Sequence, residues 1–150
     1  MQADFLTAAN REDILTDREW NVVIRDAVAA SFVASVAMFK ASLALQHTWF
    51  RFLPREHEVA HPFFAPIVDQ INTQLRKLPI VWTSAENWRV PSKCTCTGHF
   101  TMMTADDNNA PLVQPQYLDY AYVSDVYVPD VLNILSSLGV RDLSYADFLE

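Results

Sequence analysis

Apolar residues recur at three- and four-residue spacing over residues 18–46, a pattern that predicts a long helix. Most residues on this stripe are small, and small side chains allow another element to approach closely. Bulky apolar residues occupy the other sides of the same stretch. We therefore expect a helix that the rest of the fold encloses on most of its circumference. The stripe consists of Trp20, Val23, Ala27, Ala30, Ala34, Ala37, Ala41 and Ala44.

The remaining pattern predicts shorter elements. Residues 62–76 carry a helical apolar face behind an N-terminal proline, and residues 80–83 and 87–90 read as two strands of a hairpin. Helix signals return over residues 129–138, where Gly139 is a typical stop, and Ser144 is placed to cap a last short helix that runs to residue 150. The expected fold class is mainly helical α+β: a long buried helix, a second helix, a small β-hairpin and C-terminal helices. Residues 1–150 would form a single domain or a fragment of a larger protein.

The composition narrows the function. The net charge of −7 argues against non-specific nucleic-acid binding, which depends on many Lys and Arg contacts to phosphates. The chain has 2 glycines, Gly98 and Gly139, which stand apart from each other, so a glycine-rich loop that cradles phosphate is absent from the sequence. We therefore expect no nucleotide site and no cofactor in this chain itself.

The most apolar run, residues 27–45, contains one charge, Lys40. Its alanine and serine content makes membrane insertion marginal, so the sequence favours a buried helix over a membrane span, and no membrane partner is expected.

Two cysteines, Cys94 and Cys96, are too few for a disulfide framework and favour a reducing compartment, cytoplasmic or nuclear. Together with His99 they are weak candidates for a metal site. Zinc sites usually have four ligands with two to four residues between the cysteines, and the spacing here is tighter. A metal-binding module around these three residues stays as a third alternative, and ordinary loop residues are the expectation.

The N-terminal stretch brings charged residues together at the start of the long helix. Residues 4–9 are expected to be extended or loop, and they deliver Asn10, Arg11 and Glu12 to that point. An arginine guanidinium is always charged and presents a planar fork to phosphate oxygens. Arg11 therefore either contacts a phosphate on a neighbouring domain or forms an internal salt bridge to Glu12 or Asp13.

Several motifs, in this order and spacing, resemble a stretch of the sacsin/NO VEIN-like group of GHKL-type ATPase proteins that lies downstream of the ATP-binding fold. The resemblance covers most of the chain. The motifs that carry it are Gln2-Ala-Asp-Phe-Leu-Thr, Asn10-Arg-Glu-Asp-Ile-Leu, Glu19-Trp-Asn, Trp49-Phe-Arg-Phe-Leu-Pro, His61-Pro-Phe-Phe-Ala-Pro, Leu78-Pro-Ile-Val-Trp-Thr, Asn87-Trp-Arg-Val-Pro and Leu138-Gly-Val-Arg-Asp-Leu-Ser.

Asn10-Arg11-Glu12 is also similar to a Ser-Arg-Glu segment in the middle domain of a heat-shock chaperone with the same kind of ATPase. The resemblance implies that Arg11 meets the terminal phosphate of Mg-ATP bound by the preceding domain of a parent chain, with Asn10 and Glu12 beside it. Asn10 departs from the serine of that chaperone.

The resemblance thus implies a non-catalytic, chaperone-type middle segment that couples nucleotide state to the rest of its parent. The partners would be the neighbouring GHKL domain and other proteins. The isolated chain would not be an enzyme, although the parent would be an ATPase. The alternative is a protein-interaction or scaffold module with no link to nucleotide.

Overall fold

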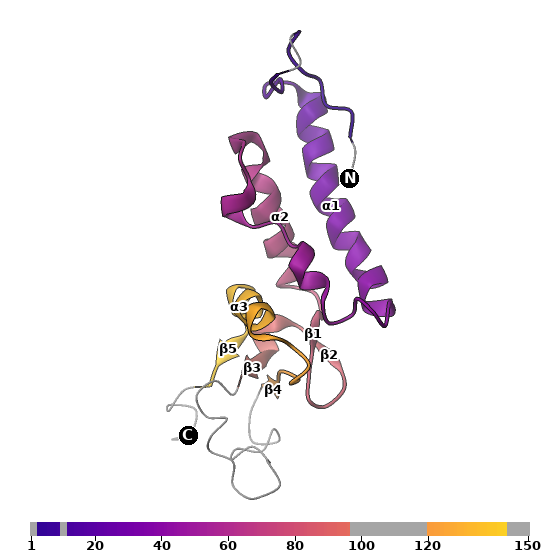
Figure 1. Ribbon diagram of the computed structural model, residues 1–150, viewed down its shortest axis with the longest axis vertical. Helices are drawn as coiled ribbons and strands as arrows, with labels where there is room; N and C mark the ends of the chain where they lie inside the picture. Colours follow the sequence, from indigo (N-terminus) through magenta and orange to yellow (C-terminus); the bar gives the residue numbers. More distant parts are fainter. Residues whose placement is uncertain (1–2, 10–11, 97–119, 144–150) are drawn as a thin grey trace, which may run out of the picture. The chain divides into compact units, whose positions relative to one another are not determined.

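The computed structural model describes residues 3–9, 12–96 and 120–143 (Figure 1). The chain divides into two compact units, Met1–Gln74 and Leu75–Glu150, and each is treated on its own. Helices dominate the described residues and two small sheets accompany them. The mainly helical α+β class expected from the sequence is confirmed.

The first unit is built on the long helix α1, Glu19–Ala41. It begins where the pattern predicts but ends five residues early, because Ser42 leaves the helical region with φ −90° and ψ 117°. Its N-cap residue is Arg18, and no side chain caps the helix.

The expectation that α1 is enclosed on most of its circumference is also wrong. Its buried residues are Asn21, Ala29 and Val36, and the small-residue stripe faces solvent. The helix packs through the opposite side, which carries larger side chains such as Phe32 and Phe39. Burying bulky side chains removes more apolar area from water than burying alanine, so the bulky face is the one that the fold covers.

Three short 3-10 helices follow α1: η1 (Trp49–Phe52), η2 (Glu56–Glu58) and η3 (Pro62–Phe64). The last leads directly into α2, Ala65–Leu75, which confirms the second helix. The core of this unit is aromatic. Trp49 and Phe50 are fully buried and their ring centroids lie 4.1 Å apart, while Phe39 of α1 stacks on Trp49 at 6.0 Å.

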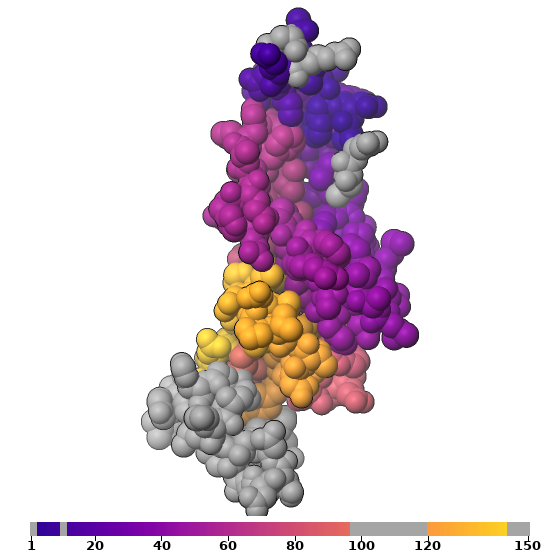
Figure 2. All heavy atoms as spheres, in the orientation of Figure 1, coloured from indigo at the N-terminus to yellow at the C-terminus, as the bar shows by residue number. Residues whose placement is uncertain are grey.

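α1 and α2 are also joined by polar contacts, and Figure 2 shows the atoms of α2 against those of α1. Asp26 Oδ1 accepts hydrogen bonds from Gln70 Nε2 at 3.0 Å and from Arg25 Nε at 2.9 Å. The bond from Gln70, followed by that from Arg25, lowers the pKa of Asp26 below its usual range. The Arg25 guanidinium lies 5.1 Å from the ring centroid of Phe63. The charged side chains of Arg25 and Asp26 therefore both contact other residues of the first unit.

The second unit begins with the predicted hairpin. Strands β1 (Val81–Trp82) and β2 (Trp88–Arg89) pair antiparallel, and Trp82 lies opposite Trp88. Glu86, in the connecting turn, has a positive φ of 55°. The hairpin expected around Ser84-Ala85-Glu86 is confirmed.

A three-stranded parallel sheet follows η4 (Pro91–Lys93), with the order β4-β3-β5. The strands are β3 (Cys94–Cys96), β4 (Ala121–Tyr122) and β5 (Arg141–Asp142). The sequence predicts no sheet here. Each strand spans only two or three residues, which is too short for an alternating pattern to show.

Helix α3, Pro129–Ser137, connects β4 to β5 and confirms the helix predicted there. It ends in a Schellman motif, in which Gly139 N donates to Ser136 O and Val140 N donates to Leu135 O, both at 3.0 Å. Gly139 has a φ of 111°, so the residue expected to stop the helix does so because its backbone adopts a positive φ. The last helix, expected over residues 144–150, lies outside the described residues.

Candidate functional site

The segment that precedes α1 folds back on itself on both sides of residues 10 and 11. Thr7 and Ile14 form an isolated antiparallel bridge. Ala8 N donates to Asp13 O at 2.9 Å, and Leu15 N donates to Leu6 O at 3.1 Å. The described residues on the two sides of Arg11 are therefore hydrogen-bonded to each other through their backbones.

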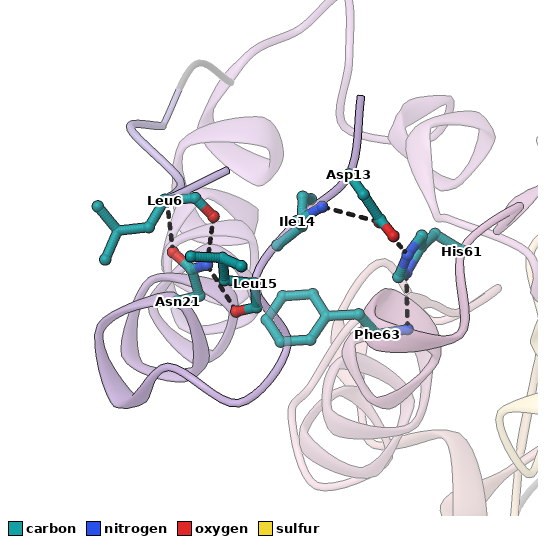
Figure 3. Close-up of polar contacts among 7 residues, drawn as sticks. All are labelled: Leu6, Asp13, Ile14, Leu15, Asn21, His61 and Phe63. Carbon is teal, nitrogen blue, oxygen red and sulfur yellow. Dashed lines mark hydrogen bonds and ion pairs between the residues drawn. The ribbon is translucent and has the colours of Figure 1, made fainter. Parts of the chain in front are cut away.

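Asn21 attaches this paired segment to α1 (Figure 3). Its Oδ1 accepts from Leu6 N at 2.7 Å, and its Nδ2 donates to Leu6 O at 2.8 Å and to Leu15 O at 2.9 Å. The Asn21 side chain is completely buried, with an exposed fraction of 0%. One amide therefore holds both arms of the segment, and the helix fixes the position of that amide.

A second attachment joins the segment to η3 (Figure 3). His61 Nδ1 accepts from Phe63 N at 3.1 Å, so Nε2 carries the ring proton of the neutral imidazole. That nitrogen lies 3.2 Å from Asp13 Oδ1, to which it donates. Asp13 Oδ1 also accepts from Ile14 N at 2.8 Å. The segment is thus fixed at two points, one on the helix and one on the loop before α2.

An aromatic contact reinforces the attachment. Phe5 meets the rings of Phe63 and Phe64 edge to face, with centroids 6.3 Å and 5.5 Å away. Edge-to-face contact is a favoured arrangement for aromatic pairs. The segment therefore has both polar and apolar contacts with the rest of the first unit.

Of the three predicted nucleotide-contact residues, the structure describes only Glu12. Asn10 and Arg11 are outside the described residues, and Glu12 is described as an exposed residue in a bend. The structure therefore shows the contacts that fix the residues before and after Arg11, and it does not describe Arg11 itself. Sequence reasoning missed the roles of Asn21 and His61. The sequence feature that could have revealed Asn21 is the presence of a polar amide on the side of the helix that carries bulky apolar residues.

Cys94 and Cys96 lie on β3, two residues apart, and both thiols are free. Cys94 is fully buried and its Sγ donates to Val90 O at 3.5 Å. Within the described part of the chain, no three His, Cys, Asp or Glu residues come together in a way that could hold a metal ion. His99, the third member of the weak metal candidate, lies outside the described residues.

Burial raises the pKa of each of these two thiols to about 11. We therefore expect both to resist alkylation: at pH 8, iodoacetamide should react about a hundredfold more slowly than with an ordinary cysteine, because only the thiolate is nucleophilic. Mass spectrometry of labelling against time measures this, and protein unfolded in urea serves as the fully reactive control. Labelling of the native protein at the unfolded rate would contradict the burial of the thiols.

The raised pKa also predicts how stability depends on pH. The folded chain keeps these protons to higher pH than the unfolded chain does. The stabilisation that this provides is fully present below about pH 9 and is lost as the pH rises through about 11.

No protein family, no curated protein and no solved structure matches this chain.

Proposed function

We propose that this chain is a non-catalytic segment that couples the nucleotide state of a neighbouring GHKL-type ATPase domain to the rest of a parent protein, with Arg11 as the contact. Asn10 and Glu12 would flank the contact, and the parent would bind Mg-ATP. The observation that best supports the proposal is the Asn21 amide, which holds both Leu6 and Leu15 at distances of 2.7–2.9 Å.

Firm attachment matters because a guanidinium assists phosphoryl transfer only when it is held in place. A shift of about 1 Å in a positioned group can cost about a hundredfold in rate. The two arms that flank Arg11 are paired by backbone bonds and fixed to α1 through Asn21 and to η3 through His61. Such a segment is suited to presenting a side chain to a surface outside the chain.

The chain contributes a contact and not a nucleotide site. Its 2 glycines are isolated, and a net charge of −7 does not favour binding of an anionic nucleotide. Calorimetric titration of the isolated chain with Mg-ATP should accordingly show no heat of binding, and a micromolar dissociation constant would contradict this part of the proposal.

The direct test is Arg11→Ala in the parent protein that carries the ATPase domain. We expect ATP turnover to fall by about tenfold or more while nucleotide affinity stays nearly unchanged, because the contact forms in the closed, reacting state. Arg11→Lys should restore only part of the turnover, since an ammonium keeps the charge and loses the planar fork.

Arg18→Ala is the matched control, because Arg18 is an exposed arginine at the start of α1 whose Nε lies 3.6 Å from Oδ1 of the adjacent, exposed Asp17. It should leave turnover unchanged. A structural salt bridge of Arg11 predicts another pattern: a lower melting temperature with normal turnover per folded molecule. Unchanged turnover in a stable Arg11→Ala protein would remove Arg11 from the mechanism.

The second candidate function is a protein-interaction module with no nucleotide link. The exposed apolar side of α1 favours it, because Trp20 and Val23 leave 57% and 56% of their surface exposed, and Met38 leaves 74%. Contiguous apolar surface of this kind is typical of interaction sites.

A further inference from the structure

The exposed side of α1 follows a heptad pattern. Seven residues recur at alternating spacings of three and four, and the structure leaves every one of them exposed. Of the other residues of the helix, only Glu19, Ser31 and Met38 are exposed. This spacing is the signature of a helix that packs along another helix at a shallow angle. The seven residues, called the α1 stripe below, are Trp20, Val23, Ala27, Ala30, Ala34, Ala37 and Ala41.

The α1 stripe is held in a defined conformation. One edge of the stripe packs within the first unit through Asp26, which is hydrogen-bonded to Gln70 of α2, and the opposite side of α1 packs through the stacked rings of Phe39 and Trp49. The largest side chain of the stripe, Trp20, donates its indole N–H to Asp4 O at 3.1 Å, which orients the ring while 57% of the residue stays exposed. Preorganised aromatic side chains lose little conformational entropy on binding and serve well as interface anchors.

We propose that the α1 stripe binds the same stripe of a second copy of this chain, with the two helices antiparallel. This inference supplies a partner for the second candidate function, and it does not depend on contact between Arg11 and a phosphate. The two-fold arrangement makes one surface serve as both halves of the interface, as in most homodimers.

The sizes of the side chains fit one antiparallel register. With Ala27 beside Ala30 of the second copy, Trp20 lies beside Ala37 and Val23 beside Ala34. Each large residue thus meets a small one, and the centre is alanine on alanine. Small residues at the centre allow two helix axes to approach to about 8 Å. At each end, Trp20 fills the space that the small Ala37 of the second copy leaves. A parallel pair would instead place Trp20 against Trp20.

The charges fit the same register. Glu19 lies in the first turn of α1 and Lys40 in the last, and both occupy the same edge of the stripe, since 21 residues correspond to three heptads. The antiparallel register places Glu19 opposite Lys40 of the second copy, twice in each dimer. In a parallel pair Glu19 would face Ile24. Antiparallel helices also bring opposite ends of their dipoles together.

By length and composition α1 is also apolar enough to cross a membrane. The arrangement in the unit favours a protein partner instead. Arg25 and Asp26 lie on α1 itself, and Asp26 is hydrogen-bonded to Gln70 of α2, so insertion of the helix would carry charges and their polar partner into the bilayer. The stripe is also mostly alanine, which gains little from contact with lipid chains.

The first test measures mass against concentration for the full chain by sedimentation equilibrium. We expect monomers at ~1 µM and dimers at ~500 µM, with reversible exchange by mass action. Ala34→Glu places two charges within the interface, each beside Val23 of the other copy, and should leave a monomer at both concentrations. Thr73→Glu, on an exposed position of α2, is the control and should associate like the wild type.

The second test distinguishes the register. Glu19→Lys and Lys40→Glu should each weaken self-association about tenfold, because each variant places like charges opposite one another twice in the dimer. An equimolar mixture of the two variants should recover wild-type association, since each Lys then faces a Glu. Failure of the mixture to recover would overturn the antiparallel register.

Monomers at ~500 µM would overturn the inference, as would dimers that survive Ala34→Glu. Flotation with vesicles of neutral phospholipid completes the test: binding of a monomeric wild type that Ala34→Glu abolishes would assign the stripe to a membrane surface and overturn self-association. ATP turnover in the parent is a separate measurement. A failure of the self-association proposal can therefore be told apart from a failure of the proposed contact between Arg11 and a phosphate.

Discussion

Replacing Trp49 by alanine is expected to lower the free energy of unfolding by about 3–5 kcal/mol, the range typical for removing a buried tryptophan. Trp49 has no exposed surface, and its ring stacks on Phe50 at 4.1 Å and on Phe39 at 6.0 Å. Removing it would leave a cavity where α1 meets η1. Urea unfolding, followed by far-ultraviolet circular dichroism, measures the change.

Trp49→Phe is the informative control. Among the described residues the buried Nε1 of Trp49 has no hydrogen-bond partner, and an unpaired buried donor costs about 1–3 kcal/mol. Phenylalanine removes that donor while it keeps an aromatic ring in the stack. We therefore expect Trp49→Phe to stay within about 1 kcal/mol of the wild type, because relief of the donor offsets the smaller ring. A loss as large as that of Trp49→Ala would show that the indole nitrogen is satisfied in solution.

Local patterns predicted the elements whose signals lie in adjacent residues. The second helix combines an N-terminal proline with a clear apolar face, the hairpin brackets a short polar turn, and Gly139 ends α3 where it was expected to. In each case the determinants are turn chemistry and periodicity within about a dozen residues. Such signals do not depend on the rest of the fold.

The parallel sheet could not be predicted in this way. Thr95 of β3 lies beside Tyr122 of β4 and Arg141 of β5, so its partners are 27 and 46 residues away. Parallel pairing at that separation is a tertiary choice, and strands of two or three residues carry no periodic signal. The same limit applies to α1, because the pattern indicated a helix but not which of its two apolar sides the fold would cover.

The candidate site likewise has one part that the sequence predicts and another that only the structure reveals. Arg11 was selected through a resemblance and through the chemistry of guanidinium, and both are readable from the sequence. The residues that hold the segment around Arg11 could not be read from the sequence. Asn21 and His61 bind Leu6, Leu15 and Asp13, and these residues come close to them only in the folded segment. A single polar residue on an apolar helix side was the one available hint.

Asn21→Ala is expected to destabilise the N-terminal segment by about 2–3 kcal/mol, since it removes three hydrogen bonds and leaves Leu6 N, Leu6 O and Leu15 O without that partner. Hydrogen exchange measures the effect locally: the amides of Leu6, Ala8 and Leu15 should lose protection while those in the centre of α1 keep theirs. Asn133→Ala, at an exposed position of α3, is the control and should change stability by less than about 0.5 kcal/mol.

The same variant links the structure to the proposed function. If the segment must be fixed for Arg11 to reach a phosphate, Asn21→Ala in the parent should lower ATP turnover in the direction of Arg11→Ala, although Asn21 itself is buried and does not face a ligand. Combining the two substitutions should then cost little more than Arg11→Ala alone, because both remove one contact. Additive losses would mean that Asn21 acts on the fold generally. Lost protection at Leu6 and Leu15 with normal turnover would contradict the idea that a fixed segment is needed for coupling.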